Sequence, residues 1–361
     1  MRVLHIVNDA ETGGAQTLIE QLMLARPEGD DAHLLVLMGQ GALSPRLEAA
    51  ATSTAYVGMT RRDVVPLRAM RALRRLVAEH GIQVVHSHLQ QSDLVNEVTP
   101  HGARRVATLH NSLHLAQKPV TRVTWWLAAQ ASARLDAVVA CSNSALGFAA
   151  ESHYRFGTEH IRVVHNGTRI SPVPAPEPSG PPVFVHLGRC VEQKDHPTLF
   201  RAFARVLAEH PDARLFCAGH LVDPGNEALT IELETLGIGQ AVTLLGSVSD
   251  VHALIRTAHA VVFASNHEAL PMAGLEALSE GVPVITTDTG DAKLLAVDPQ
   301  AVVPVRDPEA LGRAMNRFVD LPAAERGEWR RRSWELGRTE FDSRGTARRY
   351  RELYEELTDG S

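Results

Sequence analysis

Two glutamates stand eight positions apart in the second half of the chain, directly after a short apolar run at 260–264. Glu268 precedes a helix-like stretch and Glu276 lies within it. Pro271 suits the start of that helix, because the N–H that it lacks would find no helical acceptor there. The amides of the first helical turn are then free for a ligand, and two carboxylates can accept hydrogen bonds from hydroxyls on two parts of that ligand. The alternative is that Glu268 merely favours the helix dipole and that Glu276 is a surface residue.

Two cations follow another strand-like run, at 183–187. Gly188 and Arg189 come directly after this run, and Lys194 lies five residues beyond Arg189, just before a helix-like stretch. Such cations at the carboxyl edge of a sheet suit a diphosphate, since arginine offers a planar fork and lysine a compact charge. The alternative is two solvated surface cations. The position at the strand end favours the binding interpretation.

Gly13 and Gly14 follow the first strand-like run and open a helix-like stretch at 15–25. Glycines let the backbone approach a ligand closely, and the amides at a helix N-terminus attract anions. The segment lacks the G-x-G-x-x-G pattern of dinucleotide-binding proteins. A flexible turn is an equally good explanation of this segment taken alone.

The elements that position these residues alternate between strand and helix along the chain. The apolar runs are short and almost continuous, which is typical of strands buried on both faces of a parallel sheet. The predicted strands are Arg2–Asn8, His33–Met38, Ala55–Met59, Gln83–His88, Val106–His110, Ala137–Ser142, Arg162–Asn166, Val183–Leu187, Arg214–Ala218, Val242–Leu245, Ala260–Ala264, Pro283–Thr287 and Ala301–Val305.

A proline-rich segment, with six prolines in residues 171–182, separates the two runs of elements and predicts a semi-extended linker. We therefore predict an α/β protein with a Rossmann-like domain at 1–170 and a second one at 183–340. A charged C-terminal helix within 341–361 is expected to pack back toward the first domain. Parallel sheets of this kind bind ligands at the carboxyl ends of their strands, and clefts between domains are common ligand sites.

The composition is that of a globular protein, with 44 % hydrophobic and 22 % charged residues in 361. No apolar run is long enough to span a membrane, and the start of the chain does not look like a signal peptide. Three cysteines without metal spacing indicate reduced thiols and a cytoplasmic protein. The net charge is +3 over residues 1–170 (17 basic, 14 acidic) and −9 over residues 171–361 (19 basic, 28 acidic), which argues against nucleic-acid binding.

Histidine and arginine patterns raise two further alternatives. His86 and His88 lie on one face of a predicted strand, where they either reach a ligand or pack; packing is favoured. The predicted helix 66–79 carries apolar residues on one side and arginines on much of the rest. Such a helix can lie on the inner face of an anionic membrane, which would suit a lipid-linked acceptor. It is also what a helix covering a sheet looks like, and this second interpretation is favoured.

The motifs taken together resemble glycosyltransferase family 4, a group of sugar transferases with the GT-B fold. Glu268 and Glu276 form the E-x7-E pattern of the retaining enzymes of this fold. The other matches come in the family's order over residues 1 to about 290: Gly13-Gly-Ala-Gln16, Thr108-Leu-His110, Ala140-Cys-Ser142, His165-Asn-Gly167, Leu187-Gly-Arg189 with Lys194, Cys217-Ala-Gly219 and Leu245-Gly246. The resemblance implies two Rossmann-like domains whose parallel sheets face a central cleft.

The resemblance also implies roles for these residues. Arg189 and Lys194 would hold the donor diphosphate, Glu276 the ribose, and Glu268 the hydroxyls of the transferred sugar. His110 would lie near the sugar and the acceptor, so the implied catalytic residues are His110, Arg189, Lys194 and Glu268. The implied donor-binding residues are Gly13, Gly14, Gly188, Arg189, Lys194, Gly219, Val248, Glu268, Leu270, Pro271, Met272 and Glu276.

By the same resemblance, the enzyme moves a sugar from a nucleoside-diphosphate donor, most readily of the UDP or GDP type, to a hydroxyl of a glycan, lipid-linked or small-molecule acceptor. The anomeric configuration is retained. No D-x-D pair occurs in the chain, which fits a metal-independent enzyme without a cofactor. Three positions depart from the family pattern: Gln16, Ala269 and the segment Thr289–Lys293. A nucleotide-sugar epimerase, which the E-x7-E context disfavours, and a non-catalytic sugar-nucleotide-binding protein are the alternatives.

Overall fold

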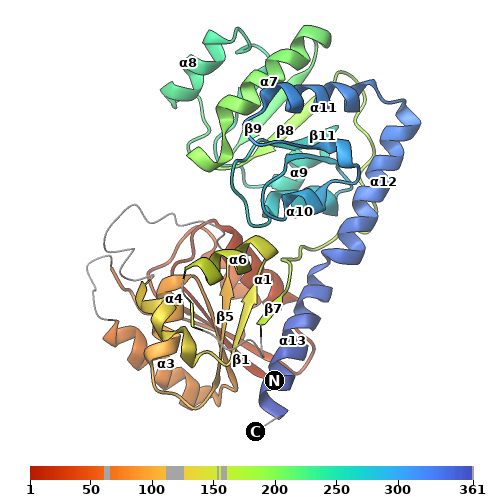
Figure 1. The fold of residues 1–361 in the computed structure, drawn as a ribbon. Coiled ribbons are helices and arrows are strands. Elements are labelled where there is room, and N and C mark those ends of the chain that lie inside the picture. Colours follow the sequence, from red (N-terminus) through yellow and green to blue (C-terminus); the bar gives the residue numbers. More distant parts are fainter. Residues whose placement is uncertain (61–65, 111–125, 153, 156–160, 360–361) are drawn as a thin grey trace. The chain divides into compact units, whose positions relative to one another are not determined.

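The computed structural model describes residues 1–60, 66–110, 126–152, 154–155 and 161–359, and it divides the chain into two compact units (Figure 1). The N-terminal unit comprises Met1–Gly167 together with Ser343–Ser361, and the C-terminal unit comprises Thr168–Asp342. The boundaries therefore lie at 167/168 and 342/343, close to but not at the expected 170/171 and 340/341. Among the described residues, no helix combines the length and the apolarity that crossing a membrane requires.

The N-terminal unit is built on a seven-stranded parallel sheet with the order β3-β2-β1-β4-β5-β6-β7. Each expected strand of this half is present, with bounds that differ by a few residues. The strands are β1 Arg2–Val7, β2 Asp31–Val36, β3 Ser53–Tyr56, β4 Val84–His88, β5 Arg104–Leu109, β6 Ala137–Ala140 and β7 Ile161–Val163. The helices are α1 Gly14–Leu24, α2 Ser44–Ala50, α3 Leu67–His80, α4 Gln90–Val98, α6 Asn143–Glu151 and α13 Ser343–Asp359.

Helices cover both faces of this sheet, as continuous apolar strands require. On one face, Val3 and Val106 belong to a core shared with Leu18 of α1 and Leu353 of α13. The C-terminal helix α13 thus forms part of the N-terminal unit, to which its last residues contribute buried apolar side chains.

The arginine-rich helix α3 covers the other face of the sheet. Leu73 and Leu76 are buried there against Leu4 and Val85 of β1 and β4. The arginines of the helix are exposed: Arg68, Arg71, Arg74 and Arg75. The apolar side of α3 is therefore used by the core, as expected of a helix that covers a sheet.

The C-terminal unit contains a six-stranded parallel sheet with the order β10-β9-β8-β11-β12-β13. Its strands are β8 Val183–Leu187, β9 Arg214–Ala218, β10 Val242–Leu244, β11 Ala260–Phe263, β12 Val284–Thr287 and β13 Val302–Val303. Its helices are α7 His196–Glu209, α8 Glu227–Thr235, α9 Val251–Arg256, α10 Met272–Ser279, α11 Pro308–Asp320 and α12 Ala323–Glu340. Pro271 directly precedes α10, one position earlier than expected.

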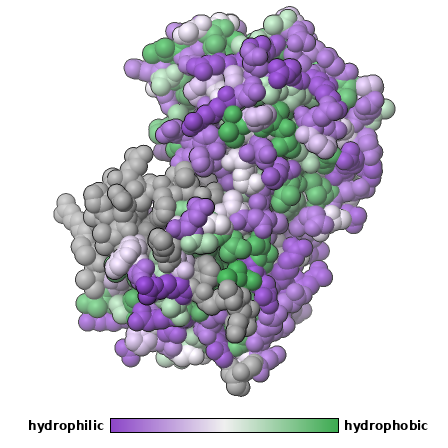
Figure 2. Space-filling model, viewed as in Figure 1, coloured by the Kyte–Doolittle hydropathy of each residue, from purple (hydrophilic) through white to green (hydrophobic). Residues whose placement is uncertain are grey.

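Helix α12 carries a polar outer surface, which Figure 2 shows as a hydrophilic strip. Arg331 contributes to this surface through ion pairs with Glu328 at 2.6 Å and Glu335 at 2.5 Å, one helical turn away on either side. Trp329 of the same helix is buried in the core of the C-terminal unit, and Arg330, Ser333 and Gly337 are buried as well.

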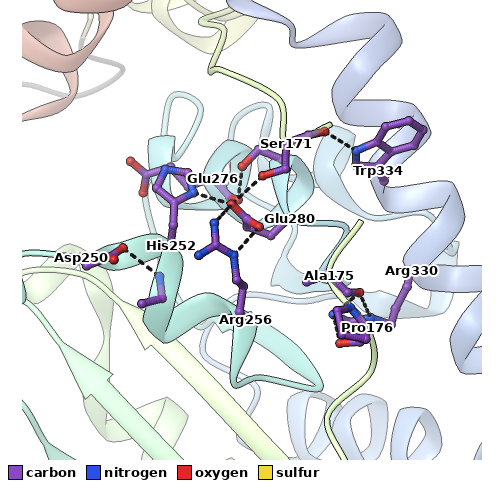
Figure 3. A network of polar contacts seen from close by, with 12 residues as sticks. Ser171, Ala175, Pro176, Asp250, His252, Arg256, Glu276, Glu280, Arg330 and Trp334 are labelled. Atoms are coloured by element: carbon purple, nitrogen blue, oxygen red, sulfur yellow. Dashed lines mark hydrogen bonds and ion pairs between the residues drawn. The ribbon is translucent and has the colours of Figure 1, made fainter. Parts of the chain in front are cut away.

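The proline-rich segment 171–182 belongs to the C-terminal unit and does not stand apart as a linker (Figure 3). The amide of Ser171 donates to the carbonyl of Ser279 at 3.2 Å, and that of Ala175 donates to the carbonyl of Glu280 at 2.8 Å. The guanidinium of Arg330 donates to the carbonyl of Ala175 at 3.1 Å. Proline removes amide donors but leaves carbonyls, and an arginine from α12 uses them.

Candidate functional site

The predicted site residues of the C-terminal unit gather where the strand order of its sheet changes direction. From β8 the chain proceeds outward to β9 and β10, and then returns to β11 on the other side of β8. The loops after β8 and β11 diverge at this point and leave the crevice in which open α/β sheets bind ligands. Gly188, Arg189 and Lys194 follow β8, and Glu268 follows β11.

Lys194 and Glu268 form an ion pair across this crevice. Lys194 ends the short 3-10 turn Glu192–Lys194, and only 18 % of its side chain and 12 % of that of Glu268 are exposed. The hydroxyl of Ser265 also donates to Glu268 Oε1 at 2.8 Å. The amide of Glu268 donates to Thr289 Oγ1 at 3.2 Å. The carboxylate of Glu268 is therefore held by the loops after β8 and β11, and its backbone by the loop after β12.

Arg189 lies in a different environment, because its side chain is exposed and forms no ion pair within the described part of the chain. Of the two predicted phosphate-binding cations, the structure thus leaves Arg189 uncompensated and neutralises Lys194 with Glu268. An anion could therefore bind Arg189 directly, whereas at Lys194 it would compete with the carboxylate of Glu268.

Backbone hydrogen bonds join the loops after β8, β9 and β10. The amide of Gly188 donates to the carbonyl of Ala218 at 3.0 Å, and that of Gly219 donates to the carbonyl of Gly246 at 2.8 Å. Gly219 has φ +154°, and a Cβ there would lie 2.1 Å from the carbonyl oxygen of Gly188. Only glycine fits this approach. Val248, in the loop after β10, is half-buried against the core.

Helix α10 places the remaining predicted residues of this unit. Leu270 and Pro271 are buried just before the helix, and Met272 begins it. The N–H groups of Met272 and Ala273 begin α10, where a helix offers no acceptor, and they are available to a ligand, whereas the N–H of Gly274 donates to the carbonyl of Pro271 at 2.9 Å. Glu276 lies further along α10, eight positions after Glu268, and is half-buried. Glu280, one turn later, accepts from Ser171, His252 and Arg256 (Figure 3).

The segment Thr289–Lys293, a departure from the family pattern, supports the loop of Glu268. Gly290 has φ +51°, and a Cβ on it would lie 1.9 Å from the carbonyl oxygen of Glu268. The amide of Asp291 donates to the carbonyl of Ala269 at 2.9 Å. Ala269 has no positive φ, as expected for a residue that replaces glycine.

His186, which the sequence did not single out as a site residue, lies on β8 beneath these loops. Its Nδ1 lies 2.9 Å from the carbonyl oxygen of Val262 and must donate, because a carbonyl only accepts. Burial lowers the pKa of His186 well below its usual value, so the ring is neutral and Nε2 carries a lone pair. That atom is buried, has no hydrogen-bond partner among the described residues, and would lie 3.1 Å from a Cβ at Gly188. The only sequence signal for a role of His186 is its position three residues before Arg189, at the start of the same motif.

The N-terminal unit has a similar change of direction between β1 and β4. Gly13 is the extended N-cap of α1 and Gly14 is its first residue, so both lie where the sequence placed them. Across the crevice, Leu89 directly precedes α4 as its N-cap and has φ +77°, a strained conformation for a branched side chain. The amide of Ser92 donates to Asn8 Oδ1 at 2.9 Å and ties the two loops together.

His110 follows β5 in the same unit. Its Nε2 lies 3.1 Å from Nδ1 of His88, and burial lowers its pKa to about 4, so the ring is neutral near pH 7. His86 and His88 are wholly buried, as the packing interpretation expected. His110 is therefore equipped to exchange hydrogen bonds and protons and carries no charge with which to bind an anion.

Two family models match consecutive parts of the chain. The one described as Glycosyltransferase Family 4 covers residues 12–171, and the one described as Glycosyl transferases group 1 covers residues 169–334. The uncharacterized glycosyltransferase MJ1059 of Methanocaldococcus jannaschii is 35 % identical over 115 residues, which is 31 % of this chain and 28 % of that protein. The lipopolysaccharide core biosynthesis glycosyltransferase LpsE of Rhizobium meliloti is 29 % identical over 167 residues, which is 44 % of this chain and 47 % of that protein.

These matches span less than half the length of either relative. Among solved structures, Anabaena HepE in complex with UDP and glucose has a TM-score of 0.81 at 16 % identity and covers 99 % of this chain and 100 % of its own. At this identity the likeness shows the fold. The two matched models follow one another along the chain and agree with the two parallel sheets, so the chain belongs to the GT-B glycosyltransferases of the family 4 type.

Proposed function

We propose that this protein transfers a sugar from a nucleoside-diphosphate donor to a hydroxyl acceptor. The ion pair of Lys194 and Glu268 carries the proposal, because it places a cation for phosphate beside a carboxylate for sugar hydroxyls. Both lie at the point of an α/β sheet where ligands bind, within a group 1 glycosyltransferase domain. A domain that only recognised a nucleotide would gain nothing from a carboxylate so close to its phosphates.

The donor is recognised through charge and backbone. Arg189 and Lys194 bind the diphosphate, and the N–H groups at the start of α10 contribute hydrogen bonds without a net charge. Glu276 accepts from the ribose hydroxyls, and the loops at Gly219 and Val248 line the base. The donor is a nucleotide sugar of the UDP or GDP type; HepE, which shares the fold, was solved with UDP and glucose, and this supports the UDP type.

The reaction proceeds with retention and without a metal. As the bond between the sugar and the phosphate breaks, negative charge grows on the leaving diphosphate, and Arg189 and Lys194 stabilise it. The departing phosphate helps to take the acceptor proton, and the neutral ring of His110 orients the reacting hydroxyls. The E-x7-E arrangement of Glu268 and Glu276 supports the retaining course. A glycan, a lipid-linked sugar or a small molecule is the acceptor.

The proposal is tested by incubating the protein with UDP-, GDP- and ADP-sugars and a panel of hydroxyl acceptors. Acceptor-dependent release of a nucleoside diphosphate, with a product of retained configuration by NMR, supports it. Interconversion of sugars without release of nucleotide shows an epimerase, and tight binding without turnover shows a binding protein. Full activity in excess EDTA supports the metal-independent course, and loss that Mg²⁺ or Mn²⁺ restores contradicts it.

A further inference from the structure

A row of hydrogen-bonded histidines lies under one face of the N-terminal sheet. His5 Nδ1 is 3.2 Å from His88 Nε2, and His88 Nδ1 is 3.1 Å from His110 Nε2. The strand register explains the row, since His5 of β1 is paired with His86 of β4, and His88 with Thr108 of β5. Paired residues of neighbouring strands, and residues two apart on one strand, point to the same face.

The fourth histidine, His86, is occupied by hydroxyl groups. Its Nδ1 lies 2.6 Å from the hydroxyl of Tyr354, and its Nε2 lies 2.7 Å from that of Thr108. Thr108 in turn lies 3.1 Å from the hydroxyl of Tyr350, so helix α13 closes the network from the side opposite the sheet. Burial raises the pKa of both tyrosines above their usual value, which keeps the phenols protonated.

His5, His86 and His88 also lie close enough together to hold a metal ion, with one ligand atom from each within 4.8 Å of the others. Binding a metal would cost His86 one of its two hydroxyl partners, and it would break the contact between His5 and His88. Both nitrogens of His86 and of His88, and Nδ1 of His5, already take part in hydrogen bonds, which favours a proton network over a metal site. Metal binding becomes an outcome of the test.

The contacts among the three linked rings permit two arrangements of protons. At each contact one nitrogen must carry a proton and the other a lone pair. If His88 is protonated on Nε2, it donates to His5 and accepts from His110 Nε2, so His110 Nδ1 carries a lone pair. If His88 is protonated on Nδ1, it accepts from His5 and donates to His110, so His110 Nδ1 carries a proton. A mixed state would place two protons or two lone pairs in one short contact.

We propose that His88 is a positioning residue that determines which nitrogen of His110 carries the proton, and that this proton position changes only together with those of His88 and His5. In one such change a proton enters at His110 Nδ1, and the Nε2 proton of His110 passes to His88 Nδ1. The Nε2 proton of His88 passes to His5 Nδ1, and the Nε2 proton of His5 leaves. Every ring is neutral before and after.

The far end of this relay meets a cavity. A hollow of about 50 Å³ is lined by His5 together with Tyr350, Tyr354, Arg26 and Asp30. Since one water needs about 10–15 Å³, the hollow has room for about three. A water molecule in this hollow would give or take the proton at His5, so the row of rings joins the cavity to His110.

The test uses the full chain with ¹⁵N-labelled histidine, and His110→Gln identifies the ring signals of His110. We expect His88→Leu to change the ratio of the two neutral tautomers of His110. The matched control is His33→Leu, because His33 is a buried histidine paired with Leu4 and therefore lies on the opposite face of the sheet. That control leaves the His110 signals unchanged. Unchanged His110 signals in His88→Leu overturn the proposal, as does stoichiometric binding of Zn²⁺ that His5→Ala abolishes.

The activity arm rests on the proposed function. His88→Leu lowers kcat at least about tenfold, within the range that proton handling provides, with the KM for the donor unchanged. His88→Asn keeps a hydrogen-bonding amide beside His110 but passes no proton on to His5, so it recovers only the part of kcat that depends on the orientation of His110; equal loss in both variants contradicts the positioning role. If the wild-type protein transfers no sugar, the proposed function is wrong. The ¹⁵N signals of the His110 ring then still show whether His88 determines its proton position.

Discussion

Replacing Glu268 by glutamine separates nucleotide binding from sugar transfer. In the structure Glu268 neutralises Lys194, so a diphosphate must compete with this carboxylate for the cation. Glutamine keeps the shape of the side chain and removes its charge. We expect Glu268→Gln to bind a bare nucleoside diphosphate more tightly than the wild type, and to transfer sugar more slowly.

The burial of the ion pair of Lys194 and Glu268 determines how much the affinity for the diphosphate should change. Fully exposed ion pairs contribute about 0–1 kcal/mol, whereas breaking a buried pair costs about 3–5 kcal/mol. Side chains that are 18 % and 12 % exposed lie between these cases. A competing interaction of about 1.4 kcal/mol corresponds to a tenfold change, so affinity for the diphosphate rises by up to about tenfold at low salt. Transfer falls by about 10²–10³, as for the loss of one preorganised electrostatic contact.

Calorimetry with UDP and GDP, together with initial rates of transfer, measures both quantities. Glu192→Gln is the matched control, because it removes the same charge from an exposed position two residues before Lys194. It should change affinity by less than about twofold if the effect depends on the pair and not on net charge. A Glu268→Gln protein that binds the diphosphate tenfold more weakly would refute the reasoning.

Three further predictions follow from the site. Arg189→Ala lowers kcat/KM for the nucleotide sugar by about 10²–10³ without changing the melting temperature, because this cation is exposed and forms no ion pair within the described residues; near-normal turnover would contradict it. Glu276→Ala weakens binding of the bare nucleoside diphosphate more than Glu268→Ala does, and calorimetry showing equal losses would remove its assignment to the ribose. Burial lowers the pKa of His5 to about 4 from an unfolded value of 6.5, so its contribution to stability is present above pH 6.5 and is lost as pH falls toward 4. His5 alone therefore contributes about 2 kcal/mol less stability at pH 5 than at pH 7.5, and urea unfolding of His5→Leu should show a loss of stability smaller by about that amount over this pH range.

The sheets could be predicted from the sequence because the signal for buried parallel strands is local. Runs such as 183–187 and 260–264 are apolar without interruption, and glycines and polar residues follow them at the strand ends. The same logic located Gly188, Arg189 and Glu268, since the loops after parallel strands lie at one edge. The positions of these residues along the chain were therefore sufficient to place them near a ligand crevice.

The contacts between these residues were not predictable, because they depend on register and on side chains far apart in the chain. Lys194 and Glu268 are 74 positions apart. The proline-rich segment 171–182 looked like a free linker, because nothing within it shows that Arg330 binds its carbonyls. The segment Thr289–Lys293 departs from the family pattern, and only the structure shows that its Gly290 approaches Glu268 so closely that glycine is needed there. The proton position on His186 required the carbonyl of Val262, which the sequence could not place.

In both units the strand order of the sheet changes direction at one point, but the side chains beside that point differ in charge. The proposed reaction gives a reason for this difference. At the C-terminal crevice the functional groups are charged or partly charged: Arg189, Lys194 and Glu268. In the N-terminal unit the corresponding groups are neutral imidazoles and hydroxyls, in which burial suppresses charge on residues such as His5 and His110. A leaving diphosphate must be met by positive charge, whereas an acceptor hydroxyl must be oriented and its proton managed without attracting the diphosphate. The division of the chain into two units thus keeps the proposed donor site, which is charged, and the neutral hydrogen-bonding network on separate cores, where burial can set the pKa of the groups in each independently.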